Sequence, residues 1–169
     1  ASQAVVVTGT GFQDGVMASF SGTGVTVNSV TFTDATSIIL NVSVDAAAAT
    51  GARDLTLTNP DAGTSTTASA FTVVARPVAT SLSPSSRGQG AASQVITVTG
   101  ADFVSGMSAS FSGTGVTVNS VSVTNSTTAT ITITVSATAS TDARDLTLTN
   151  TDAGTSTRRS EEHTSELQS

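Results

Sequence analysis

The sequence contains no cysteine, lysine, tryptophan or tyrosine. Without cysteine there is neither a disulfide nor a thiolate metal site. No run of 18 apolar residues occurs, so no membrane-spanning helix is predicted. The opening residues ASQAVVV lack a basic flank and a cleavage site, so they are not expected to be a signal peptide. These absences remove redox chemistry at sulfur and membrane insertion from the functions to be considered.

Charge is scarce and mostly negative. Before Arg159 the chain has five Arg against nine Asp, which gives a formal charge of −4, and it has neither Glu nor His there. An acidic surface without lysine repels phosphate backbones, so nucleic-acid binding is not expected. Ser and Thr supply the polar surface instead, which fits either a genomic composition bias or an extracellular surface poor in protease sites.

An internal repeat organises the sequence. The segment ASFSGTGVTVNSV at Ala18–Val30 recurs unchanged at Ala109–Val121, an offset of 91 residues, and Phe12 and Phe103 keep the same offset. A fixed period of this size indicates one folding unit copied in tandem. We therefore predict two domains, residues 1–75 and 76–158.

Each unit is predicted to be built from about seven short strands at roughly ten-residue spacing, the pattern of an all-β sandwich. Apolar residues alternate with polar ones, except that the alternation changes phase at Asn28–Ser29, where we expect a bulge. Asp45–Gly51 is predicted to be a loop or a single helical turn, and Ala70–Ala75 the last strand. The residues expected to face the core of the first unit are Val5, Val7, Phe12, Val16, Ala18, Phe20, Val25, Val27, Val30, Phe32, Leu40, Val42, Val44, Leu55, Leu57, Phe71 and Val73.

The two copies differ at their ends. Ala1 aligns with Ala92, so the first copy has no equivalent of the strand and loop at Val78–Ala91. The second copy departs from the first after Thr157, where an equivalent of Ala70–Ala75 is due. Each sandwich is therefore expected to miss a terminal strand.

The last residues, Arg159–Ser169, read RSEEHTSELQS and hold all three Glu and the only His. This segment resembles the in-frame translation of a short-read sequencing adapter; the rival interpretation is a natural charged tail. We treat residues 159–169 as non-native and expect them to pack poorly. His163 with Glu161 and Glu162 would otherwise suggest a metal or acid–base site.

Several segments together resemble the IPT/TIG domain, an immunoglobulin-like fold shared by plexins and some transcription factors. They are SLSPSS at Ser81–Ser86, VTGADF at Val98–Phe103, LTLTNPDAGTS at Leu55–Ser65 and AFTVV at Ala70–Val74. The resemblance implies two tandem immunoglobulin-like (E-set type) β-sandwiches, with no catalytic residues and no cofactor to assign. An Arg53–Asp54 pair departs from the usual pattern of the family.

No catalytic, cofactor-binding or metal-binding residue is assigned from the sequence. A hydrolytic triad needs a base, and the only His lies in the tail. The Asp residues stand singly, as Asp14, Asp34 and Asp45 do in predicted turns. Calcium held by Asp61 with Asp14 or Asp102 is conceivable, but the acidic spacing of a calcium loop is absent.

Three recurring features have simpler explanations. Arg53–Asp54, repeated as Arg144–Asp145, is expected to be solvated charge at a strand edge; the alternative is a contact between repeats near Arg76–Pro77. The glycosylation spacings at Asn41 and Asn125 are expected to be coincidental. The six Phe, which are expected in the core, do not form an aromatic platform for sugars; they are Phe12, Phe20, Phe32, Phe71, Phe103 and Phe111.

These observations favour a non-catalytic structural repeat of an extracellular or cell-surface bacterial protein known from environmental DNA, such as an adhesin-like stalk. The alternative is a carbohydrate-binding accessory module of a secreted polysaccharide-acting enzyme. The expected partners are neighbouring repeats of the same chain, with glycans or surface proteins as further candidates. Association of copies through open strand edges is a third hypothesis.

Overall fold

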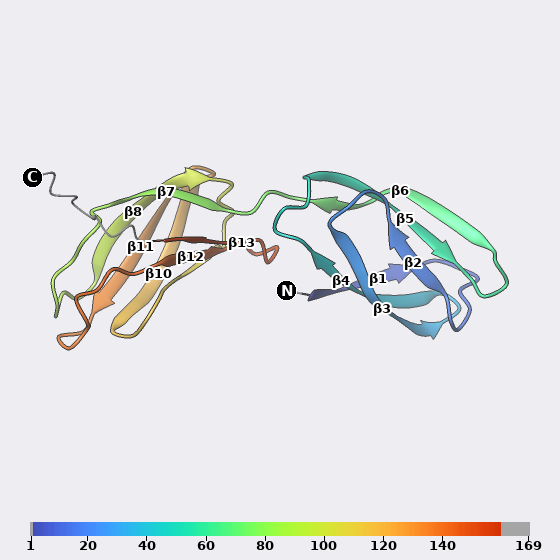
Figure 1. Cartoon of the computed structure of the whole chain (residues 1–169), viewed down its shortest axis with the longest axis horizontal. Helices are drawn as coiled ribbons and strands as arrows, with labels where there is room; N and C mark the ends of the chain where they lie inside the picture. Colours follow the sequence, from blue (N-terminus) through green and yellow to red (C-terminus); the bar gives the residue numbers. More distant parts are fainter. Residues whose placement is uncertain (1, 160–169) are drawn as a thin grey trace, which may run out of the picture. The chain divides into compact units, whose positions relative to one another are not determined.

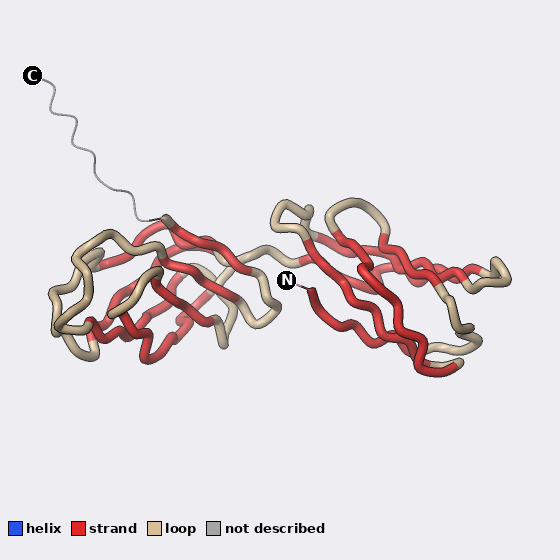
Figure 2. The backbone as a smooth tube through the Cα atoms, turned by 60° about the horizontal axis from the view of Figure 1, so that its bottom comes forward, coloured by secondary structure: helices blue, strands red, loops and turns tan. Residues whose placement is uncertain are grey.

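The computed structural model describes residues 2–159. The chain divides into two compact units, Ala1–Val74 and Ala75–Ser169. Within the described residues every regular element is a β-strand, which Figure 2 shows as red segments joined by loops. The predicted all-β class with immunoglobulin-like sandwiches is confirmed. Residues 2–159 contain no helix with the length and apolar character needed to cross a membrane.

Unit 1 is a sandwich of two three-stranded sheets in which all paired strands are antiparallel (Figure 1). One sheet has the order β1-β4-β3 and the other the order β2-β5-β6. The strands are β1 (Ser2–Thr8), β2 (Met17–Phe20), β3 (Val25–Asp34), β4 (Ser37–Val44), β5 (Gly51–Thr58) and β6 (Thr64–Val73).

The core of unit 1 follows the alternation of its strands. Ile38, Leu40 and Val42 of β4 are buried. The register of β3 against β4 shifts between Val27 and Ser29. This bulge restores the inward direction of the side chains that follow it, as the change of phase in the sequence predicted.

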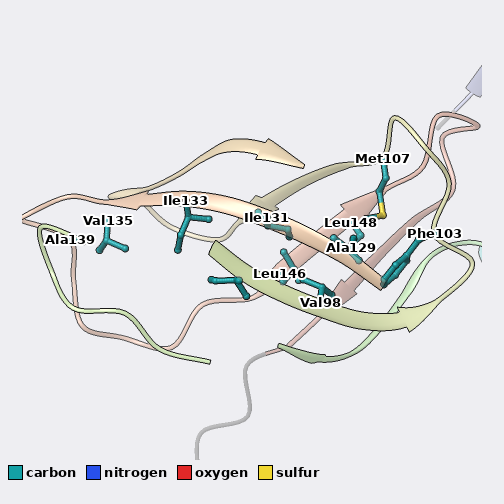
Figure 3. Close-up of a cluster of buried hydrophobic side chains, with 11 residues drawn as sticks. Val98, Phe103, Met107, Ala129, Ile131, Ile133, Val135, Ala139, Leu146 and Leu148 are labelled. Atoms are coloured by element: carbon teal, nitrogen blue, oxygen red, sulfur yellow. The ribbon is translucent and has the colours of Figure 1, made fainter. Parts of the chain in front are cut away.

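Unit 2 contains a four-stranded sheet, β10-β11-β8-β7, and a three-stranded sheet, β13-β12-β9. The strands are β7 (Val78–Ser83), β8 (Gln94–Ala101), β9 (Ser108–Phe111), β10 (Val116–Asn125), β11 (Thr128–Val135), β12 (Leu146–Thr149) and β13 (Thr155–Arg158). Its core includes Val98, Ile131 and Leu148, which are completely buried (Figure 3). β7 pairs with one edge of β8. The strand of unit 1 that is equivalent to β8 is β1, and it lies at the edge of its sheet.

Val44 does not face the core as predicted. It is 39% exposed, whereas its counterpart Val135 is 8% exposed. The Val135 amide donates a hydrogen bond to the Ala91 carbonyl at 2.8 Å, so the segment that leads into β8 lies over it. The burial of this position therefore depends on a covering segment, which is described only in unit 2.

The last strand of unit 1 is longer than the predicted Ala70–Ala75, because β6 runs through the polar stretch from Thr64. Its register against β5 shifts between Arg53 and Leu55, and Ser69 has a φ of 54°. The Asp54 carboxylate accepts a hydrogen bond from the Ser69 amide at 2.8 Å. This bond stabilises the bulge between β5 and β6. The bulge separates the polar first half of β6 from its apolar second half.

Gly9 follows β1 and does not have a positive φ. A Cβ at Gly9 would lie 2.6 Å from the ring of Phe12. Phe12 packs against the core of unit 1, as predicted. Glycine is therefore required at position 9 because the aromatic ring closes over the backbone, and not because of a special φ.

Candidate functional site

An arginine holds a loop in place in each unit, and we call this arrangement the arginine clamp. In unit 1 the Arg53 guanidinium donates to the Ala49 carbonyl at 2.6 Å. In unit 2 the Arg144 guanidinium donates to the Ser112 carbonyl at 2.9 Å, and to the Ser140 carbonyl and hydroxyl at 3.2 and 2.8 Å. In unit 1 the clamp ties the loop before β5 to β5 itself, and in unit 2 it ties the loop before β12 to Ser112, the residue after β9.

The residue after each arginine is tied to the serine that begins the SGTG turn. The Ser21 amide donates to the Asp54 carbonyl, and the Asp54 amide donates to the Ser21 hydroxyl, both at 2.9 Å. Ser112 and Asp145 repeat this pair of bonds at 2.9 and 2.8 Å.

The recurring Arg–Asp pair is half-buried and hydrogen-bonded, so the interpretation as solvated charge was wrong. Its role in each unit is to connect strand, loop and turn. The proposed contact between repeats through Arg53 stays a prediction.

Two aspartates stabilise turns with their carboxylates. Asp34 accepts hydrogen bonds from the Thr36 hydroxyl at 2.6 Å and the Thr36 amide at 2.7 Å, and these bonds lower the pKa of Asp34. Asp61 accepts from the Gly63 amide at 2.9 Å and the Gln13 side chain at 2.7 Å, which lowers the pKa of Asp61. A lowered pKa keeps both carboxyls ionised near neutral pH, which is the opposite of what a general acid requires.

The calcium hypothesis finds no acidic cluster to support it. Among residues 2–159, no group of three or more His, Asp or Glu side chains is placed to hold a metal ion. The two oxygens of Asp61 already accept from Gly63 and Gln13. Metal binding at Asp61 would therefore compete with the hydrogen bonds that form its turn.

The two asparagines with glycosylation spacing also have structural roles. The Asn125 side chain accepts from the Thr127 amide and hydroxyl, both at 2.9 Å, in the turn between β10 and β11. The Asn41 carbonyl oxygen accepts from the Asn28 side chain at 2.9 Å. Asn125 takes the place in unit 2 that Asp34 occupies in unit 1.

The aromatic side chains lie where the sequence predicted. Phe103 is buried and the other five Phe are half-buried, and Phe20 packs against Phe71 with ring centroids 5.2 Å apart. No ring is left to form an exposed platform among the described residues. The usual means of holding a sugar by stacking is therefore absent from this part of the chain.

Unit 2 has a groove of about 730 Å³ that sequence reasoning missed. Apolar side chains of both sheets line it, among them Phe111, Ile133 and Leu146. The loops at residues 85–89 and 140–144 also line it, with Arg144 among them. The departure of the second copy from the first after Thr157 was the signal in the sequence that could have located it.

Comparison with known families bears on this unit. Residues 77–160 match the model of the IPT/TIG domain family. Unit 2 contains an IPT/TIG domain. No curated protein and no solved structure matches the chain.

The IPT/TIG domain spans all the strands of unit 2, from β7 to β13. It is an immunoglobulin-like, non-catalytic module, and no catalytic family is identified in the chain. The groove and the arginine clamp of unit 2 both lie within the matched residues.

Proposed function

We propose that the chain is a non-catalytic structural segment of an extracellular or cell-surface bacterial protein, in which two tandem IPT/TIG units act as a stalk or spacer. The observation that carries this proposal is the strand-by-strand equivalence of the units. Ala18 pairs with Leu57 in unit 1, and Ala109 pairs with Leu148 in unit 2, in the same antiparallel register. We therefore assign unit 1 to the same domain type as unit 2.

The connection between the units supports serial repetition. β6 ends at Val73 and β7 begins at Val78, so only residues 74–77 connect them. Pro77 is completely buried and cannot donate to a β-ladder, so it separates the two sheets in sequence. Modules joined by short connections in one chain suit a spacer, in which each repeat contributes length.

The charged residues and the surface also support a structural role. Arg53, Arg144, Asp34 and Asp61 are engaged in clamps and turns within their own units. Paired Thr hydroxyls lie across neighbouring strands, such as Thr56 with Thr66 at 3.0 Å. A neutral hydroxyl surface without lysine offers few sites to trypsin-like proteases, which suits an exposed stalk.

Two measurements test the proposal together. Antibodies raised against the folded chain should label intact, unpermeabilised cells of the source bacterium. On a glycan array the folded chain should retain no glycan above the level of the heat-denatured chain. Specific retention of one glycan class would favour the accessory-module alternative, and labelling only after permeabilisation would reject the surface location.

A further inference from the structure

We propose that the outer face of the sheet β2-β5-β6, with its equivalent on β9-β12-β13, binds the same face of a second copy of the chain. We call it the hydroxyl face, and the proposal does not depend on the stalk function. In unit 1 its residues are the outward side chains of the three strands, namely Met17, Ser19, Thr56, Thr58, Thr64 and Thr66. In unit 2 they are Ser108, Ser110, Thr147, Thr149, Thr155 and Thr157.

The differences between the two copies are concentrated on one sheet of the sandwich. β11 repeats only the last residue of β4, the central strand of the sheet β1-β4-β3. In the other sheet, residues 52–59 recur unchanged as residues 143–150. The core itself accepts exchanges between apolar residues, because Val16 of unit 1 is replaced by Met107 and both are buried. One sheet has therefore kept its sequence in both copies while the other has diverged.

The exposed positions show the same contrast. Val6 and Ile39 lie opposite each other on the outer face of β1-β4-β3, where both are exposed. In unit 2 these positions carry Thr97 and Thr130. On the hydroxyl face every position except Met17 carries the same residue in both units. Most exposed residues can change with little effect on stability, so identity of exposed side chains indicates a surface role that the two units share.

The chemistry of the face favours a copy of itself as the partner. A serine or threonine hydroxyl is both a donor and an acceptor, so a surface of hydroxyls can form hydrogen bonds with an identical surface. The face carries no charged side chain, whereas the whole chain has a formal net charge of −6. Two copies can therefore meet here, related by a twofold axis, without bringing like charges together.

Apolar groups add to these hydrogen bonds. Met17 is 63% exposed, and its flexible thioether suits packing against the methyl groups of a facing threonine row. The hydroxyls are ordered in pairs across the strands, Thr56 with Thr66 and Thr147 with Thr157, both at 3.0 Å. Each face has far fewer residues than the roughly 20–30 that a partner contributes to a stable complex, so we expect a weak association.

Sedimentation velocity of the full chain tests the proposal. The weight-average sedimentation coefficient should rise between about 10 μM and 1 mM protein. Thr56→Arg combined with Thr147→Arg should weaken the association at least about tenfold, because it places like charges opposite each other. The control, Ile39→Arg combined with Thr130→Arg, adds the same charges to the other sheet and should associate as the unmodified chain does.

Three outcomes would overturn the proposal. The first is a chain that stays monomeric up to roughly 1 mM. The second is an equal loss in both double variants, or a loss in the control alone, which would assign the association to the Val6–Ile39 face. The third is dissociation by a neutral oligosaccharide, cellohexaose at about 1 mM, which would assign the hydroxyl face to a sugar.

Disulfide cross-linking keeps the proposal testable if an arginine unfolds its unit. The chain contains no cysteine, so a single introduced thiol reports contacts between copies. Under a mild oxidant, Thr56→Cys should form linked dimers faster than Ile39→Cys, because a twofold contact brings Thr56 near its own copy. Equal rates for the two variants, or a faster rate for Ile39→Cys, would reject the hydroxyl face as the interface.

Discussion

The ring of Phe20 packs against the ring of Phe71 with centroids 5.2 Å apart and planes inclined at 45°. Phe20 lies on β2 and Phe71 on β6, the two strands that flank β5, so the pair joins both edges of one sheet on its inner face. Phe111, the same residue in the second repeat, lines a groove instead. The phenylalanine at this position of the repeat therefore packs against another ring in unit 1 and lines a groove in unit 2.

Phe71→Ala should destabilise unit 1 by about 2–3 kcal/mol, because it removes a half-buried ring and its aromatic partner contact. Urea denaturation followed by far-UV circular dichroism measures the change. Thr72→Ala alters the neighbouring, exposed residue and should cost less than about 0.5 kcal/mol. Similar losses for both variants would mean that the Phe20–Phe71 pair does not hold the sheet together.

Gly100→Ala should be more destabilising than Gly9→Ala, by roughly 1 kcal/mol or more, although the two glycines are repeat counterparts. A Cβ at Gly100 would collide with the Val78 carbonyl of β7 as well as with the Phe103 ring. At Gly9 the obstacle is the far end of the Phe12 side chain, which can shift at a lower cost than a backbone carbonyl paired in a sheet. Denaturation of each variant gives the free energies of unfolding, and amide exchange should show β7 loosened only in Gly100→Ala. An equal cost would mean that β7 yields without loss.

Asp34→Asn should flatten the loss of stability of unit 1 in acid and should lower its stability at pH 7 only by the part that the carboxylate charge contributes. The folded pKa of Asp34 is below its unfolded value, because Thr36 donates to the carboxylate. Its stabilisation is therefore present above the unfolded value of about 4 and is lost as the pH falls through the folded pKa. Thermal unfolding from pH 2 to pH 7 measures the slope.

The second repeat supplies the reciprocal control for this pH effect. Asn125 forms the same turn bonds to Thr127, so an amide is compatible with the turn. Asn125→Asp should give unit 2 an additional loss of stability in acid. An unchanged acid slope in both variants would show that these turns do not contribute to the pH dependence.

Arg144→Ala should loosen the loop at residues 136–143 and cost unit 2 about 1–2 kcal/mol, because Ser112 and Ser140 lose charged hydrogen-bond donors. Limited proteolysis with a nonspecific protease should show faster cleavage in this loop. Arg144→Lys should restore little, since one ammonium group cannot serve both serines as the planar guanidinium does. Full rescue by lysine would indicate that charge alone, without the clamp geometry, holds the loop.

Much of the fold followed from periodicity and repetition. The inward rows, the bulge after Val27 and the turn at Asp34 are local properties of alternation and turn chemistry, and the structure has them where the sequence predicted. The burial of Val44 was predicted wrongly because burial depends on a covering segment distant in sequence. The length of β6 was underestimated, because its polar half pairs with β5 through a bulge that composition does not reveal.

The candidate sites were harder to predict than the strands. The Arg53–Asp54 repeat stood out in the sequence, but its role depends on Ser21 and Ala49, which only the folded loop brings near it. The groove beside Phe111 is defined by the point where β12 and β13 begin and end, which is a property of strand pairing. A pattern of single residues identifies neither arrangement.

The shared register of β2 with β5 and of β9 with β12 also has a consequence for how the chain folds. The segment LTLT is identical in β5 and β12, and it meets ASF in both units with the same residues opposite. In the unfolded chain each of these strands therefore has two interchangeable pairing partners. Strand exchange between neighbouring repeats is a characteristic misfolding trap of repeat proteins. Synthesis from the N-terminus allows unit 1 to pair its own strands before the second LTLT has left the ribosome, which is an order that refolding from denaturant does not impose.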